Sequence, residues 1–108
     1  MGNINDLFSS TYSVSVVTSN TDSVVGGSCI VFGIYITANG TDAQCGLVAY
    51  DIAALAGVPI TTRNLRVRAI QDDSNSVEFG PSGIQFDTDL SIQFSNTPTS
   101  ATVVYKAD

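Results

Sequence analysis

The side chains in this chain that could do chemistry are mainly carboxylates. The segment from Asp72 to Glu78 brings together three carboxylates and the amide oxygen of Asn75. Hard oxygen ligands at such spacing can hold a calcium ion, but the segment lacks the fixed glycine and the ligand order of an EF-hand loop. The spacing therefore favours a solvated surface loop, with calcium binding as the alternative.

A second acidic pair, Asp87 and Asp89, adjoins a predicted strand. Such a pair more often caps a turn than acts as an acid/base couple. The chain has no histidine to activate a serine or cysteine, so the usual catalytic triads are excluded. Its one lysine, Lys106, lies almost at the C-terminus, a poor place for a rigid site. We expect no catalytic residues and a protein that is not an enzyme.

Three of the 4 basic residues fall close together, at Arg63, Arg66 and Arg68. The last two share one face of a predicted strand. One interpretation is an exposed face whose arginines pair with nearby carboxylates. The other is a small basic patch that docks an acidic partner surface, to which the arginine fork is well suited. The net charge of -6 argues against nucleic acid as a partner.

The two cysteines, Cys29 and Cys45, flank Asn39-Gly40, which is the best short hairpin signal in the sequence. If this turn closes a hairpin, the two sulfurs lie on paired strands several residues out of register, too far apart for a disulfide. We expect two reduced, semi-buried thiols. We expect no metal site, because neither a histidine nor a further cysteine is nearby as a ligand.

The elements that position these residues follow from hydrophobic alternation. Leu90, Ile92 and Phe94 alternate with polar residues, and the same period of two recurs along the chain. This period is typical of strands with one buried face. The predicted strands span 12–18, 28–38, 45–50, 65–70, 77–79, 82–86, 89–94 and 101–106.

The alternation stops after Tyr50. Asp51 could cap one short helical turn that Gly57 ends, and an irregular crossover between sheets is the alternative. Short strands separated by regular turn signals indicate a sandwich or barrel. The predicted fold is all-β: a single antiparallel β-sandwich of jelly-roll type, with at most one short helical turn.

The chain of 108 residues fits one domain. We expect an N-terminal arm at 1–11 and a β-sandwich domain at 12–108. Leu7 and Phe8 in the arm either belong to a frayed terminus or dock onto a neighbouring subunit. No signal peptide or membrane-spanning run is evident, so we expect synthesis in a cytoplasm and no membrane partner. The low charged fraction, 13%, suits a surface partly covered by other subunits.

Several segments follow one another in a familiar order. They run from Cys29 to Gly40, from Leu47 to Asp51, from Phe79 to Phe86, from Leu90 to Ile92 and from Ala101 to Tyr105. This series resembles the small β-sandwich virion proteins of tailed bacteriophages, which decorate or cement the capsid or form head fibres and knobs.

The resemblance implies a structural protein on the capsid exterior that binds the major capsid protein, without cofactors. It also implies a homo-oligomer, with a trimer favoured. On this interpretation the docking residues are Leu7, Phe8, Arg63, Arg66 and Arg68. The alternative is a fibre, knob or tail-associated module that binds glycans or receptors. Against that alternative, the chain has no tryptophan, and most tyrosines and phenylalanines fall on inward positions.

Overall fold

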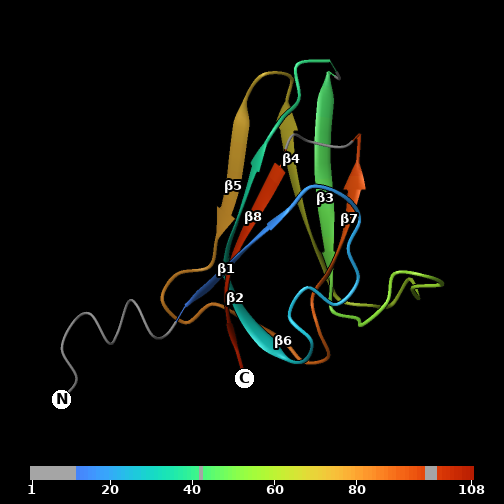
Figure 1. Ribbon diagram of the computed structural model, residues 1–108, viewed down its shortest axis with the longest axis vertical. Helices are drawn as coiled ribbons and strands as arrows, with labels where there is room; N and C mark the ends of the chain where they lie inside the picture. The colour runs from blue at the N-terminus through green and yellow to red at the C-terminus, as the bar shows by residue number, and fades with distance from the viewer. Residues whose placement is uncertain (1–11, 42, 97–99) are drawn as a thin grey trace.

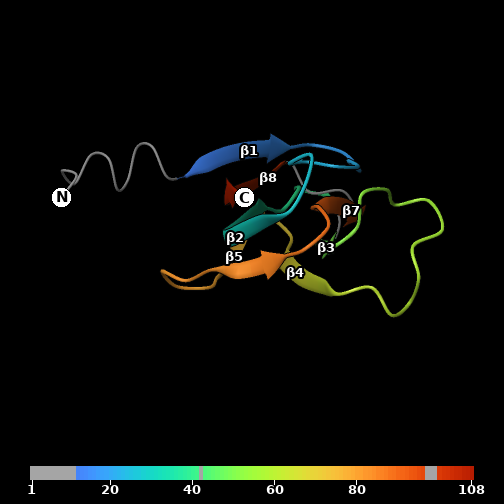
Figure 2. The same ribbon diagram turned by 90° about the horizontal axis from the view of Figure 1, so that it is seen from below.

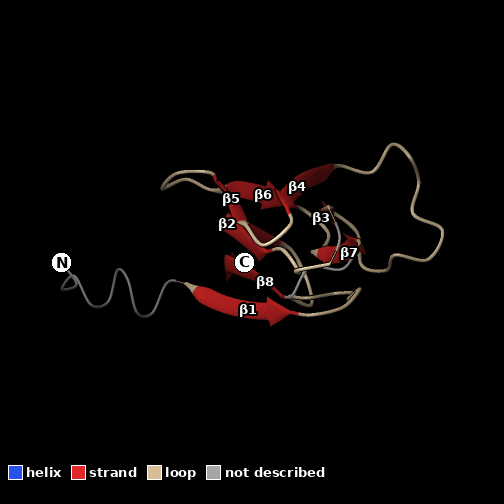
Figure 3. Cartoon of the chain, turned by 90° about the horizontal axis from the view of Figure 1, so that it is seen from above, coloured by secondary structure: helices blue, strands red, loops and turns tan. Residues whose placement is uncertain are grey.

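The computed structural model describes residues 12–41, 43–96 and 100–108. The predicted arm at 1–11, with Leu7 and Phe8, lies outside these described residues. Within them the chain forms strands and no helix (Figure 3). The strands are β1 (Ser13–Val17), β2 (Cys29–Thr37), β3 (Gln44–Tyr50), β4 (Asn64–Ile70), β5 (Ser74–Glu78), β6 (Ile84–Phe86), β7 (Ser91–Ser95) and β8 (Ser100–Ala107).

The strands form two antiparallel sheets packed against each other (Figure 1). The larger sheet has the order β1-β8-β2-β5, and β6 also pairs with β2. The smaller sheet has the order β4-β3-β7. A tight turn at 71–73 carries the chain from β4 in one sheet to β5 in the other (Figure 1). The predicted all-β, antiparallel sandwich is therefore confirmed.

The core lies between the two sheets and takes alternate residues from their strands. Leu90, Ile92, Ala101 and Val103 are completely buried, as the alternation in their strands predicts. A fully buried Val, Leu or Ile side chain contributes about 1.5–3 kcal/mol. The largest fully buried hydrophobic side chains are Val31, Ile34, Ile36, Leu47, Leu90, Ile92 and Val103, so both sheets supply the core.

The Asn39-Gly40 segment does not close the predicted hairpin. β2 pairs with β5, β6 and β8, whereas β3 pairs with β4 and β7, so this loop crosses from one sheet to the other. Neither residue has the positive φ that a tight hairpin turn of this kind requires at both positions. Instead, the Thr41 N–H donates to the Asn39 side-chain oxygen over 2.8 Å, and the Asp72 N–H donates to the Asn39 carbonyl over 3.1 Å.

The segment between β3 and β4 is irregular and contains no helical turn. It joins neighbouring strands of one sheet, so the alternative of a crossover between sheets is also wrong. The Asp51 N–H donates to the Arg63 carbonyl over 2.9 Å and closes the base of this long loop. The Asp51 carboxylate caps no helix, because it accepts hydrogen bonds from the N–H groups of Asp87 and Thr88 at 3.0 and 2.8 Å.

The predicted loop at 72–76 is shorter than expected. The turn ends at Asp73, and Ser74 already begins β5, which pairs with β2 in the register Thr37↔Ser74 to Gly33↔Glu78. Most of this edge strand is exposed, so it lacks the apolar alternation that marks a half-buried strand.

Candidate functional site

Arg66 and Arg68 lie on the outer face of the smaller sheet. Both are exposed on β4. Val67, which lies between them, and Ala69, which follows Arg68, are buried in the core. This is the arrangement that the alternation in β4 predicts. Arg63 precedes the strand and lies at the end of the long β3–β4 loop.

The three arginines differ in their partners. The Arg63 guanidinium lies 3.6 Å from the carboxylate of Asp87, in an exposed ion pair of the kind worth about 0–1 kcal/mol. Among the described residues, Arg66 and Arg68 form no ion pair. In the part of the chain that the structure describes, the interpretation of pairing with nearby carboxylates therefore holds for Arg63 only.

Neighbouring residues of β3 and β4 share this outer face with the arginines. Arg66 lies opposite Val48 of β3, and Arg68 lies opposite Gly46. A Cβ atom at Gly46 would lie 3.1 Å from Cγ of Arg68, so the stem of that arginine covers the glycine. Ile70, 61% exposed, ends the same face. We call Val48, Arg66, Arg68 and Ile70 the β4 face.

A small cavity of about 200 Å³ lies near Arg63. Its apolar lining comes from Leu65 of β4 and from Ile84 and Phe86 of β6, and Asp51 and Arg63 add charged groups. Ligand sites for drug-sized molecules are larger, roughly 300–1,000 Å³. The cavity is better matched to a single side chain from a partner protein than to a cofactor.

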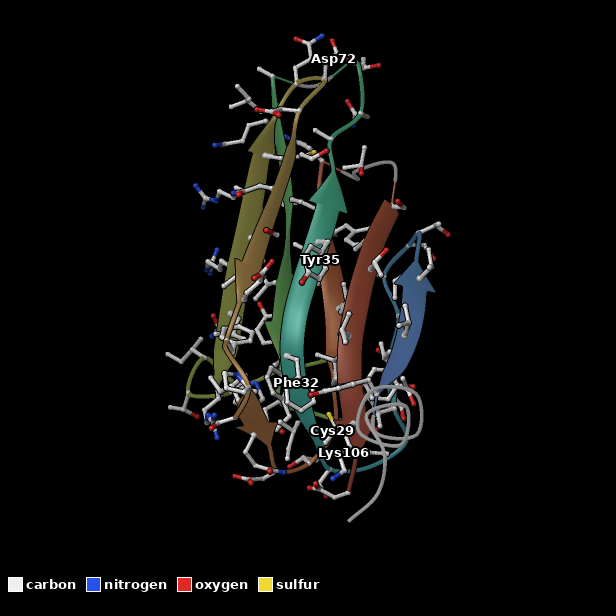
Figure 4. All side chains as sticks on the ribbon, turned by 90° about the vertical axis from the view of Figure 1, so that its left-hand side faces the viewer. Cys29, Phe32, Tyr35, Asp72 and Lys106 are labelled. Atoms are coloured by element: carbon white, nitrogen blue, oxygen red, sulfur yellow. The ribbon has the colours of Figure 1, made fainter. Side chains whose placement is uncertain are left out.

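The outer face of the larger sheet carries an exposed aromatic side chain. Tyr35 of β2 is 39% exposed, and its hydroxyl donates to the Glu78 carboxylate over 3.2 Å (Figure 4). Its ring covers Gly33, where an added Cβ would lie 2.9 Å from the Tyr35 hydroxyl oxygen. Phe32, also on β2, meets Tyr12 edge to face, with ring centroids 4.7 Å apart. These rings give this face a partly apolar character.

The residues proposed as calcium ligands are engaged in separate contacts. The Asp73 carboxylate accepts from the Ser74 N–H over 2.8 Å, and Glu78 accepts from Tyr35. The Asn75 amide donates to the Arg68 carbonyl over 2.7 Å. Across the described ranges, no three carboxylate or cysteine side chains gather into a metal-binding group.

A buried carboxylate at Asp89 is the main feature that the sequence did not identify as important. Asp89 is 3% exposed, and its oxygens accept from the Ser23 hydroxyl at 2.6 Å and from the N–H groups of Leu90 and Gly26 at 2.7 and 3.2 Å. Burial raises the pKa of Asp89, but the hydrogen bonds from Ser23 and from the backbone outweigh burial and lower the pKa below its usual value.

Ser91 extends this network to a further loop. Its buried hydroxyl donates to the Ile52 carbonyl over 2.7 Å and accepts from the Ser23 N–H over 3.1 Å. Ser23, Ile52 and Asp89 thus connect three loops that are far apart in the sequence. The turn-capping interpretation of Asp89 agrees with its bond to Leu90. No sequence signal pointed to Ser23 as its partner.

Both cysteines are free and buried, as expected, although they are more deeply buried than predicted. Cys29 lies in β2 and Cys45 in β3, so they belong to different sheets rather than to one hairpin. Burial, together with the charges of Asp89, Asp108 and Asp51, raises the pKa of Cys29 to about 11. This thiol is therefore a poor nucleophile at neutral pH.

Comparison with known proteins finds no matching family model and no matching curated protein. In the described part of the chain, no helix is long and apolar enough to cross a membrane.

Proposed function

We propose that the chain is a structural virion protein that binds and stabilises the outer surface of a phage capsid. The observation that carries this proposal is the β4 face, where two exposed arginines lack ion-pair partners among the described residues. The ordered segments that resemble small phage β-sandwich proteins supply the class of partner, the major capsid protein.

The charge distribution supports docking through the β4 face. The chain has 10 carboxylates and only 4 basic residues, so a positive surface is uncommon on it. Arginine forks form bidentate bonds with carboxylates, and Ile70 adds apolar area that docking would bury. An acidic patch on a shell subunit is the surface that complements this arrangement.

Stabilisation of the shell follows from mass action. A protein that binds only assembled capsid shifts the equilibrium toward the assembled state. Docking of this kind needs no catalytic group.

The test is co-sedimentation of the chain with shells of the major capsid protein of the phage that encodes it. We expect the wild type to sediment with the shells and Arg66→Glu to lose binding by at least about tenfold, since like-charge contacts disfavour an interface strongly. Lys106→Glu makes the same change in charge on β8 and is the matched control. Equal binding by all three proteins, or none by the wild type, would contradict the proposal.

A second candidate function is favoured by one observation on the larger sheet. Tyr35 lies in a shallow hollow of about 380 Å³ that Ile36, Thr37, Ser74, Asn75 and Ser76 also line. An exposed ring beside hydroxyl and amide groups is a composition that suits sugars. Binding to a glycan array that Tyr35→Ala abolishes would support this alternative, and a silent array would remove it.

A further inference from the structure

The edges of the two sheets are covered in different ways. An edge strand presents unpaired N–H and C=O groups, which form a template for another strand unless they are blocked. At β7 the blocking segment is 20–24. Thr21 exchanges two backbone hydrogen bonds of 2.9 Å with Ile92, the Val24 N–H donates to the Leu90 carbonyl, and the Asn20 side chain accepts from the Phe94 N–H.

The β5 edge is blocked by its own side chains. The Ser74 N–H donates to the Asp73 carboxylate, and the Ser76 N–H donates to the Asn75 side-chain oxygen over 2.9 Å. The Asn75 amide also reaches the Arg68 carbonyl on β4, so the β4 and β5 edges face each other. Charged residues on both strands further disfavour pairing with another chain.

The β1 edge has none of these protections. Within the described chain β1 pairs only with β8, in a continuous register, and no side chain hydrogen-bonds to its backbone. Its sequence, Ser13–Val17, contains no charge and no proline. Val14 and Val16 point outward and are 62% and 64% exposed. Figure 2 shows β1 at the outer end of the row formed with β8, β2 and β5.

We propose that the β1 edge binds a second copy of this chain by antiparallel β1–β1 pairing about a two-fold axis at Ser15. This register pairs all 5 residues of the strand. It places Val14 beside the partner's Val16. Paired positions are both even or both odd, so the outward faces of the two copies lie on the same side of the joined sheet. The larger sheet then continues from one copy into the next.

Charge favours a second copy at this edge over the β4 and β5 edges, which carry arginines and Glu78. The chain carries a net charge of -6, so two copies repel each other over most of their surface. β1 is uncharged, and the neighbouring β8 carries a single charge, the cation Lys106 (Figure 4). Within the described chain, this weakly charged edge is also one whose outer backbone groups have no partner. This inference is independent of capsid binding.

The first experiment measures self-association of the full chain by sedimentation equilibrium over a wide concentration range. We expect a weak dimer, because a ladder of 5 residues is short. Val16→Lys should weaken dimerisation by at least about tenfold, since the two-fold axis brings both new charges to one interface. Ile70→Lys is the matched control, because Ile70 has a similar exposure, 61%, on the β4 face. Circular dichroism checks that each variant is folded.

The second experiment tests the register by oxidative cross-linking. A disulfide requires Cα atoms about 4.4–6.8 Å apart. A mixture of Val14→Cys and Val16→Cys chains should therefore form cross-linked dimers, whereas each variant alone should not. The native cysteines are buried and do not compete.

Three outcomes would overturn the inference. They are a wild type that stays monomeric at every concentration, a dimer that Val16→Lys leaves intact, and cross-linking of either cysteine variant with itself. If the wild type is monomeric, an intrachain cross-link between Leu7→Cys and Val16→Cys would show that residues 1–11 occupy the edge instead.

Discussion

The β4 and β1 edges of this sandwich differ in the chemical character of their exposed side chains. β4 carries two exposed arginines, and its backbone is approached by Asn75 from β5. β1 carries exposed valines and serines, and its outer backbone has no partner in the described chain. A charged edge discourages a further strand but can bind a complementary surface, whereas an uncharged edge favours another strand. The two proposals therefore give the edges different partners: an acidic protein surface at β4 and a second copy at β1.

The largest expected effect comes from removing Asp89, whose network holds the segment that covers the β7 edge. Asp89→Ala should destabilise the fold by about 3 kcal/mol or more, because three hydrogen bonds, one of them buried, lose a charged acceptor. Chemical denaturation measures this change. Asp87→Ala is the matched control, with an expected loss of about 1 kcal/mol or less from its exposed ion pair. Similar losses in both variants would contradict the role given to Asp89.

The same variant should also weaken the covering of the β7 edge, so that its backbone becomes accessible as that of β1 is. If Asp89→Ala remains folded, segment 20–24 should separate from β7 more often, and the amide of Ile92 should exchange hydrogen faster. Val103, in the middle of the larger sheet, is the internal reference. Unchanged protection of the Ile92 amide would show that the Asp89 network does not hold segment 20–24 against β7.

A second prediction concerns the close packing beneath the β4 face. Gly46→Ala should cost about 1–3 kcal/mol, because the new Cβ would collide with the Val67 carbonyl and press on Arg68. Gly27→Ala has open space around it and should change stability by less than about 1 kcal/mol. Thermal and chemical denaturation of both variants provide the measurement, and a stable Gly46→Ala would show that β4 can shift outward.

A third prediction concerns alkaline pH. The pKa of Cys29 is raised from 9.0 to about 11, so its thiol remains protonated in the folded state when the unfolded chain already ionises. This group should leave stability almost unchanged below pH 9, and between pH 9 and 11 stability should fall toward a total loss of roughly 3 kcal/mol. Denaturation of wild type and Cys29→Ala across this range checks it, because the variant should lose this part of the pH dependence.

The smallest predicted effect concerns acid. The lowered pKa of Asp89 means that its contribution to stability is present above the usual aspartate pKa and is lost as the pH falls through the lowered value. Asp89→Asn should show a shallower decline in stability below about pH 4 than the wild type does. If the stability of the variant and of the wild type declined equally with falling pH, other carboxylates would be responsible for the acid sensitivity.

The sequence predicted the elements whose alternation is strong. Val67 and Ala69 inside β4, with Arg66 and Arg68 outside, follow directly from a period of two. Most of β5 gave no such signal, because its serine and asparagine residues lie exposed at an edge. The prediction of a hairpin at Asn39-Gly40 was wrong. β2 pairs with β8 and β5 on its two sides, so the chain after Thr37 does not fold back to pair with β2.

The features that depend on distant partners could not be predicted. Ser23 and Asp89 are 66 positions apart, and neither lies in a motif that identifies the other. The alternation in β1 placed Val14 and Val16 on one face. Only the strand order shows that this face is the outer one, on an edge strand. Local patterns thus predict which residues share a face, and the topology decides what that face meets.

The most direct test of the proposed function is the position of the chain on purified particles of the phage that encodes it, determined by electron cryomicroscopy. The proposal predicts density for the sandwich on the outside of the head, with Arg66 and Arg68 facing the shell. A particle without the chain on its head, or a bound chain whose β4 face is turned to solvent, would contradict it.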